Sequence, residues 1–228
     1  MRVVLLHAFP LDERMWEPQL EPLREYDVAA PRLYGRGSTF AEVASAILAA
    51  HQGELALVGA SMGGYIALEM AHQDPARAQA LVLVGARADP DTPERRAARA
   101  ETIALIESGG VEALWESWRR RLLLESAPEA AVESARAAAL DRSPEELVVA
   151  VGAARDREDR TDTLRAFAGP VLEAVGEGDG FFPPDEARAQ GQLAPHGRFR
   201  EFAGAGHLAS LEQPDEFNAA LTQFLADV

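Results

Sequence analysis

The stretch Val58-Gly59-Ala60-Ser61-Met62-Gly63-Gly64 carries the pattern Gly-x-Ser-x-Gly. It lies between an apolar run at residues 55–58 and an amphipathic helical pattern at residues 62–73. In a nucleophile elbow the chain turns sharply from strand to helix to present a serine hydroxyl, and side chains at the two glycines of the pattern would collide in that turn. The stretch therefore predicts Ser61 as a nucleophile. A simpler interpretation, in which Ser61 only caps the helix, involves no chemistry.

Strand and helix patterns alternate on both sides of this stretch. Most of the strand patterns are continuous apolar runs, which is typical of parallel strands covered on both faces. This order predicts an α/β fold with a doubly wound, mostly parallel sheet of about six strands. The expected strands are residues 3–6, 27–30, 55–58, 81–84, 171–175 and 199–202, and the expected helices are residues 15–24, 40–51, 62–73, 184–193 and 214–226.

Residues 89–167 interrupt the alternation, because they hold no convincing strand. One helix face carries Val111, Leu114, Trp115, Trp118 and Leu122. Prolines at 93, 128 and 144 each stand near a plausible helix start and divide the region into about four helices. We expect a helical lid at 89–167, inserted into a core formed by 1–88 and 168–228. The alternative is a charged, disordered linker, against which the helical period of the apolar positions argues.

The composition excludes several kinds of chemistry. The chain has no cysteine, which removes disulfides and thiolate nucleophiles, and no lysine, which removes Schiff-base catalysis. Its formal net charge is −15, so neither nucleic acid nor an anionic membrane is an expected partner. An anionic substrate would need a local basic pocket. No apolar run is long enough for a membrane span or a secretory signal, so a cytoplasmic location is expected.

The candidate base and acid follow the last two strand patterns. His207 lies in Gly204-Ala205-Gly206-His207-Leu208, where small neighbours leave room for the imidazole to reach the strand ends. The loop at 176–180 carries two carboxylates, of which Asp179 is the first choice for the acid and Glu177 the second. The resulting chain order of serine, aspartate and histidine is that of the α/β-hydrolases.

Two further groups of residues are expected around the nucleophile. An oxyanion hole needs two donors, and the backbone N–H groups of Met62 and Phe9 are the candidates. His7, close to Phe9, is interpreted as a structural residue. The candidate substrate-binding residues are Met15, Trp115, Trp118 and Phe181, although a core position is an equally good explanation for each tryptophan.

Taken together, these segments resemble the α/β-hydrolase superfamily, and within it small esterases and 3-oxoadipate enol-lactonase-like hydrolases. The resemblance rests on His-Ala-Phe-Pro at 7–10, the elbow at 59–64, Gly-Glu-Gly-Asp at 176–179 and Gly-Ala-Gly-His-Leu at 204–208. In that family the second carboxylate of the acid loop is the acid, which supports Asp179. The usual strands before the first one are missing, and Ala8 stands where the family has glycine.

The resemblance implies a serine hydrolase that cleaves a small carboxylic ester or lactone through an acyl-enzyme intermediate. Neither a metal ion nor an organic cofactor is expected. The expected partner is the small substrate itself, and a homodimer is left open. The alternatives are a C–C bond hydrolase, a thioesterase or a peptidase of the same fold, or a non-catalytic protein that binds a ligand under its lid.

Overall fold

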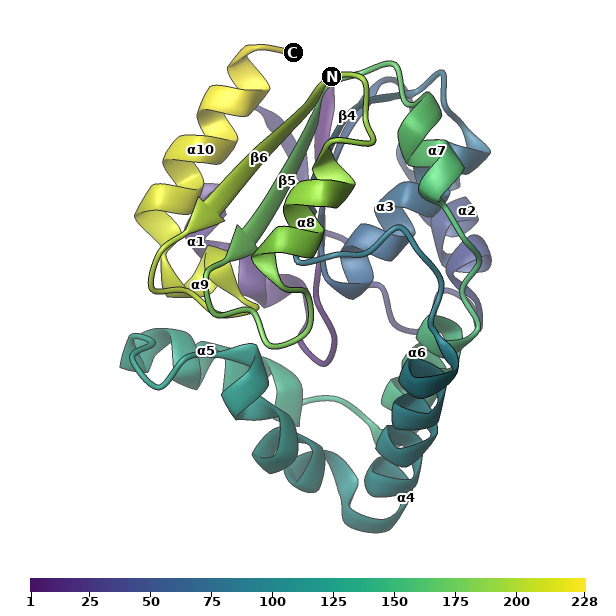
Figure 1. Cartoon of the computed structure of the whole chain (residues 1–228), viewed down its shortest axis with the longest axis vertical. Coiled ribbons are helices and arrows are strands. Elements are labelled where there is room, and N and C mark those ends of the chain that lie inside the picture. The colour runs from purple at the N-terminus through teal and green to yellow at the C-terminus, as the bar shows by residue number, and fades with distance from the viewer.

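The computed structural model describes all 228 residues and contains one six-stranded parallel sheet. The strands stand side by side in the order β2-β1-β3-β4-β5-β6. The half of the sheet formed by β4, β5 and β6 is labelled in Figure 1. Their bounds are β1 Arg2–Leu6, β2 Asp27–Ala29, β3 Leu55–Ala60, β4 Ala78–Val84, β5 Val171–Gly176 and β6 Gly197–Phe202. The predicted α/β class, with a doubly wound sheet of six strands, is confirmed.

Helices cover both faces of the sheet, as the continuous apolar strand patterns predict. Along β3, Leu55 and Leu57 face a core formed with α2 (Phe40–Ala50) and α3 (Met62–Gln73), on the side that also carries α8 (Pro184–Gly191). Ala56 and Val58 face the opposite core, which α10 (Pro214–Ala226) covers beside the short helices η1 (Glu13–Trp16), α1 (Glu17–Leu20) and α9 (Ala209–Glu212). The two groups of helices appear on opposite sides of the strands in Figure 1.

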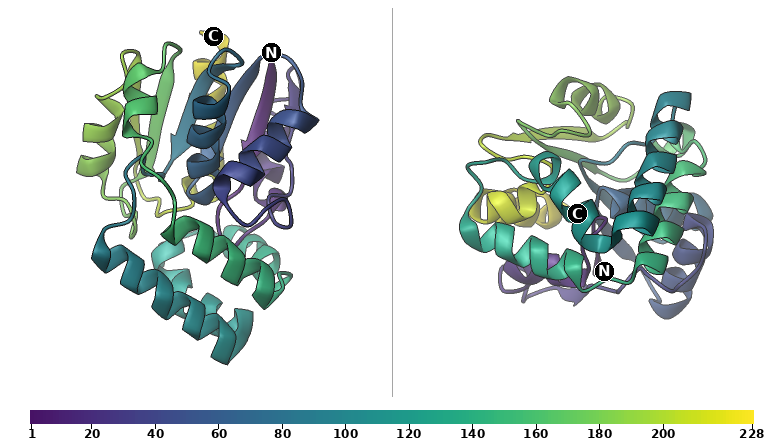
Figure 2. Two further views of the ribbon diagram at one scale, coloured as in Figure 1. Left: turned by 90° about the vertical axis from the view of Figure 1, so that its right-hand side faces the viewer. Right: turned by 90° about the horizontal axis from the view of Figure 1, so that it is seen from below.

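Four helices lie between β4 and β5, in the number that the sequence predicts. They are α4 (Pro93–Leu122), α5 (Glu129–Leu140), α6 (Pro144–Arg155) and α7 (Thr161–Ala166). The first three form a layer at the end of the sheet to which the strand arrows point, and we call α4, α5 and α6 the helical layer (Figures 1 and 2). The last, α7, packs beside α3 instead, where His72 and Thr163 lie 3.1 Å apart. The lid expected at 89–167 stays a prediction, and within that range only α4, α5 and α6 lie at the end of the sheet.

Two elements differ most from their predicted bounds. The helix expected at 15–24 is reduced to η1 and one turn of α1, because Pro22 has no N–H to continue the helical hydrogen bonds. Strand β4 begins at Ala78, three residues before the predicted start, because Ala78 and Ala80 pair with β3. Alanine has little intrinsic preference for strands, so only the neighbouring strand explains this extension.

No helix of the structure combines the length and the apolar character that a membrane crossing requires.

Candidate active site

Ser61 occupies the turn between β3 and α3, and its backbone is strained. Its φ of 48° and ψ of −110° lie in a region that residues with a side chain rarely adopt. A Cβ atom at Gly59 would come within 2.4 Å of the Gly63 backbone, and one at Gly63 within 2.0 Å of the Leu6 carbonyl oxygen. The two glycines therefore permit the sharp turn that presents Ser61, as the sequence predicts.

The imidazole of His207 is paired with a carboxylate. Nδ1 of His207 lies 2.8 Å from Oδ2 of Asp179, and both side chains are almost completely buried. The other carboxylate oxygen, Oδ1, accepts hydrogen bonds from the amides of Phe181 at 2.7 Å and Phe182 at 2.9 Å. Burial opposes ionisation of Asp179, but His207 and these two amides hold the pKa of the carboxyl below its usual range. The arrangement keeps a negative charge beside the imidazole.

Glu177, the second choice for the acid, points elsewhere. Its carboxylate accepts a hydrogen bond from the Gly204 amide at 3.0 Å, at an exposed position.

Gly85, directly after β4, leaves room for the pair formed by Asp179 and His207. Its φ is +58°, and a Cβ atom there would lie 2.8 Å from Oδ2 of Asp179 and 3.0 Å from Nδ1 of His207. The sequence analysis did not identify this glycine.

The two candidate oxyanion donors line the same cavity as Ser61 and His207. Met62 is the first residue of α3, where an N–H group has no partner within the helix. The Phe9 N–H makes no hydrogen bond in the structure, whereas the neighbouring Ala8 N–H is held by Sδ of Met15 at 3.1 Å. These two free amides are the kind of donors that an oxyanion hole uses.

His7 lies close by but is fully engaged in the fold. Its Nε2 accepts a hydrogen bond from the Leu33 amide at 3.1 Å, and its Nδ1 lies 3.1 Å from the Ala8 carbonyl oxygen. One neutral tautomer satisfies both contacts. Complete burial lowers the pKa of His7 to about 4, although the Ala8 carbonyl acts in the opposite direction. Both ring nitrogens are occupied, which agrees with the structural role expected from the sequence.

The cavity has a volume of about 400 Å³ and lies between the sheet end and the helical layer. Two of the four predicted substrate-binding residues line it. Trp118 stands between the rings of Phe9 and Phe181, at centroid distances of 5.3 Å and 5.0 Å. Phe181 in turn lies 4.7 Å from the His207 ring. An aromatic wall thus connects the helical layer to the candidate base.

The structure does not bring Met15 and Trp115 into this cavity, and the prediction for these two residues needs correction. Both are buried in the core on the α10 side of the sheet. The Met15 sulfur accepts the Ala8 amide, so it supports the loop that carries Phe9. Trp115 lies three residues before Trp118 on α4 and belongs to this core, whereas Trp118 is only partly buried against it and its side chain reaches the cavity.

Sequence reasoning missed the arginines of this cavity. Arg87, Arg95, Arg99 and Arg121 all contribute to its lining. The spacing of Arg95 and Arg99 places them on one helix face, but alternating charge on a helix usually indicates a solvated surface. Only the position of α4 over the sheet end assigns them to the cavity.

A buried carboxylate ties the helical layer to the His207 loop. The two oxygens of Glu212 accept hydrogen bonds from the Leu124 amide at 2.9 Å and the Gly206 amide at 2.8 Å. The Leu208 amide also donates to the Leu122 carbonyl at 3.1 Å. The end of α4 and the loop of the candidate base are therefore held together directly.

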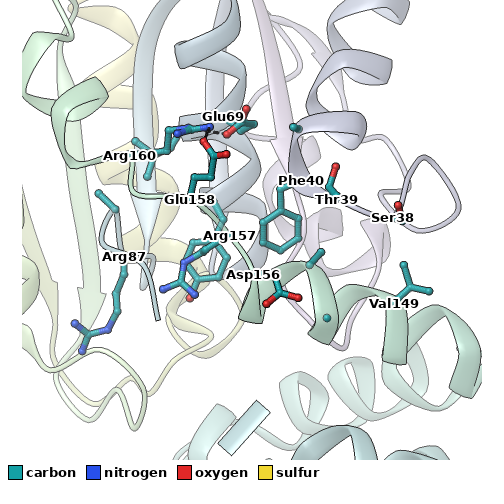
Figure 3. Close-up of a pocket in the computed structure, with 16 residues that line it drawn as sticks. Ser38, Thr39, Phe40, Glu69, Arg87, Val149, Asp156, Arg157, Glu158 and Arg160 are labelled. Atoms are coloured by element: carbon teal, nitrogen blue, oxygen red, sulfur yellow. Dashed lines mark hydrogen bonds and ion pairs between the residues drawn. The ribbon is translucent and has the colours of Figure 1, made fainter. Parts of the chain in front are cut away.

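A second cavity of about 420 Å³ lies between α2, α3 and α6 and contains neither Ser61 nor His207. Figure 3 shows Arg160 turned toward Glu69, with Nε 2.6 Å from the carboxylate. Arg157 of the same cavity is paired with Asp91 at 2.6 Å. Arg160 therefore has a carboxylate partner of its own, whereas Arg157 shares Asp91 with Arg95 and Arg99. Nowhere in the chain do three or more His, Asp or Glu side chains form a cluster that could hold a metal ion.

Comparison with known proteins agrees with this geometry. A model of the alpha/beta hydrolase family matches residues 3–220. The chain belongs to the alpha/beta hydrolase family and is an esterase-like hydrolase.

Individual relatives carry several hydrolase names. A thermophilic esterase from Thermogutta terrifontis, solved with malate bound, is 33% identical, with a TM-score of 0.93 over 100% of this chain and 90% of that one. A pimeloyl-[acyl-carrier protein] methyl ester esterase from Vibrio parahaemolyticus is 26% identical over 99% of this chain and 94% of its own length. The enol-lactonase from Burkholderia xenovorans, at 21% identity, shares the fold with a TM-score of 0.87, covering 99% of this chain and 91% of that one.

Proposed function

We propose that the protein is a serine hydrolase that cleaves a small carboxylic ester or lactone through an acyl-enzyme intermediate, with Ser61, His207 and Asp179 as its catalytic triad. The observation that carries the proposal is the 2.8 Å contact between His207 and Asp179 beside a cavity into which the strained Ser61 turn opens. The names of the relatives, two esterases among them, support ester cleavage.

In the first half of the reaction, Nε2 of His207 takes the proton of the Ser61 hydroxyl, and the oxygen attacks the ester carbonyl carbon. Asp179 holds the Nδ1 proton and stabilises the imidazolium that forms. The amides of Phe9 and Met62 donate to the carbonyl oxygen as it becomes negative. His207 then returns the proton to the leaving alcohol oxygen, which leaves the acyl group on Ser61.

In the second half, His207 takes a proton from a water molecule, which attacks the acyl carbonyl through the same oxyanion site. Collapse of this intermediate returns the proton to Ser61 and releases the carboxylic acid. We propose the helical layer as a lid that encloses the acyl chain and excludes water from the site.

The experiment that tests this function is Ser61→Ala. We expect kcat for simple carboxylic esters to fall to roughly 10⁻⁴ of the wild-type value or lower, because the nucleophile is removed. A fluorophosphonate probe should label the wild-type protein at Ser61 and should not label the variant.

A matched control is Ser108→Ala, which removes an exposed hydroxyl from α4. It should retain the activity and the labelling of the wild type. If Ser61→Ala kept more than about a tenth of the activity, this serine would not be the nucleophile.

A further inference from the structure

The cavity of Ser61 carries more positive than negative charge, in contrast to the chain as a whole. The formal net charge of the protein is −15, yet four arginines and only two carboxylates, Asp91 and Glu101, line the cavity. Long-range electrostatics of such an acidic protein would repel an anion. A concentration of guanidinium groups beside the nucleophile therefore needs a local explanation.

Structural ion pairs neutralise only part of the positive charge at this cavity. The buried Asp91 is shared by three arginines: its oxygens lie 3.1 Å from Arg99, 2.6 Å from Arg157 and 3.6 Å from Arg95. Arg95 is also paired with Asp89, so Asp91 is the one carboxylate that Arg99 and Arg157 share. Arg87, the fourth arginine of the cavity, is paired with Glu186 at 2.6 Å.

Arg121 has no carboxylate partner. Its Nη2 donates to the Gly180 carbonyl at 3.0 Å, and its guanidinium stacks on the Phe181 ring at 4.0 Å. Burial, and then the positive charge of Arg99, lower the pKa of Arg121 against an opposite effect of Asp179, and both arginines line the same cavity. The terminal nitrogens of Arg99 make no hydrogen bond, and those of Arg121 make only the one to Gly180. Several charged donors are thus free at the cavity.

We propose that this cavity selects a short ester whose acyl chain ends in a carboxylate, and that Arg121 and Arg99 bind this carboxylate; the inference rests on the proposed serine-hydrolase function. Guanidinium groups bind carboxylates through paired, charge-assisted hydrogen bonds. A carboxylate placed between the two arginines would also relieve their mutual repulsion.

The distances between the groups around Phe181 limit the length of the dicarboxylic acid that the cavity can hold. The Arg121 guanidinium and the His207 imidazole both lie against the phenyl ring of Phe181, at 4.0 Å and 4.7 Å from its centroid. A substrate that reaches Ser61 with its carbonyl and Arg121 with its carboxylate can therefore have only a few carbons between the two groups. Half-esters of short dicarboxylic acids fit this description, and their hydrolysis consumes one water and releases a dicarboxylate and an alcohol.

The test compares monomethyl glutarate with methyl pentanoate, whose acyl chains are equally long but end in a carboxylate and a methyl group. Methyl esters are preferable to aryl esters, in which the substrate's own carboxylate can attack the carbonyl. We expect the wild-type kcat/KM to favour the half-ester by roughly ten- to a hundredfold, the range of charge-assisted hydrogen bonds. Adding NaCl should reduce this preference, because salt screens charges.

Arg121→Gln and Arg99→Gln should each lower the half-ester preference by about tenfold. Arg120→Gln is the matched control, because Arg120 is adjacent in sequence, exposed and only 3.8 Å from Glu125; its preference should equal that of the wild type. Glutarate should protect Ser61 from phosphonate labelling in the wild type, and less so in Arg121→Gln.

Three outcomes would overturn the proposal: a wild-type preference of one or less, a preference unchanged by both arginine variants, or an equal fall for both esters. If methyl pentanoate is still hydrolysed and Ser61 is still labelled, these outcomes remove the carboxylate site alone. Absence of hydrolysis of both esters together with absence of labelling would overturn the proposed function as well.

Discussion

At the scale of single residues, the site depends on which carboxylate meets the imidazole. Asp179 and Glu177 are two residues apart in one glycine-rich loop, and both carry the required chemistry. The backbone hydrogen bonds of Asp179 to Phe181 and Phe182 direct its second oxygen toward His207. Glu177 instead closes the loop by accepting the Gly204 amide.

Asp179→Asn should therefore lower kcat by about 10⁴-fold, because an amide can hold the imidazole in the wrong tautomer. Glu177→Gln should stay within a few-fold of the wild type, because it keeps an acceptor for Gly204. Steady-state kinetics on a neutral ester measures both. A larger loss from Glu177→Gln than from Asp179→Asn would reverse the assignment of the acid.

At the scale of secondary-structure elements, the course of α4 determines which side chains cover the cavity. The helix is interrupted at Gly110, where φ is 73° and ψ is −168°, so its two halves run in different directions. The first half carries Arg99, and the second carries Trp118 and Arg121. The interruption allows side chains from both halves to face one cavity. The sequence predicts helix along both halves, but nothing in its periodicity determines the angle between them.

Trp118→Ala should change the relative kcat/KM among acyl chains of different length by roughly ten- to a hundredfold, since an apolar wall discriminates by about 1–3 kcal/mol per methylene. A series of neutral esters measures this preference, and phosphonate labelling of Ser61 should persist. The control is Trp115→Phe, a change in the core that should lower the thermal unfolding midpoint without altering the preference. An equal loss on every ester would place Trp118 in the core of the helical layer.

At the scale of the whole molecule, two buried titratable groups should make the stability depend on pH in opposite directions. His7 is buried and has its pKa lowered to about 4, so it stays neutral where the unfolded chain is protonated. Glu173, on β5, is fully buried with one hydrogen bond from Gln190 at 2.9 Å, and burial raises the pKa of its carboxyl. It stays protonated where the unfolded chain is ionised.

Below pH 6.5 the unfolded state gains a proton at His7 that the native state does not, so stability is lost as the pH falls from about 6.5 to about 4. The free-energy advantage of the wild type over His7→Gln should shrink over this interval by roughly 3 kcal/mol, at about 1.4 kcal/mol per pH unit. Urea unfolding at a series of pH values measures it. A difference that is independent of pH would mean that His7 titrates normally in the folded protein.

Glu173 has the opposite sign: the native state keeps a proton that the unfolded state loses, so stability falls as the pH rises above about 4.3, the ordinary value for glutamate. Glu173→Gln keeps a neutral polar group in place. Relative to the wild type, the variant should gain stability as the pH rises from 4 to 7, in the same unfolding measurement. A constant difference would contradict the raised pKa.

Local sequence patterns were enough to predict the α/β class, the six strands and the serine at the strand–helix turn. These features are local, because strand and helix periods and the glycines of a tight turn are visible within a few residues. The candidate base also followed from local pattern, since His207 lies in the loop of small residues after the last strand. For the acid, the sequence indicates one loop with two candidates, Asp179 and Glu177. Their hydrogen bonds in the structure distinguish the two.

Which side chains face the cavity depends on how distant elements pack, and no local pattern predicts it. Met15 and Trp115 were as apolar as Trp118 and Phe181, yet they pack into the core, because the side of a helix or loop that is buried depends on what covers it. Arg99 and Arg121 lie in highly charged helical sequence, which usually indicates a solvated surface. The interruption of α4 at Gly110 brings both of them over the sheet end. A local pattern specifies an element, whereas a binding site depends on how distant elements are placed against one another, and this placement is decided only when the whole core packs.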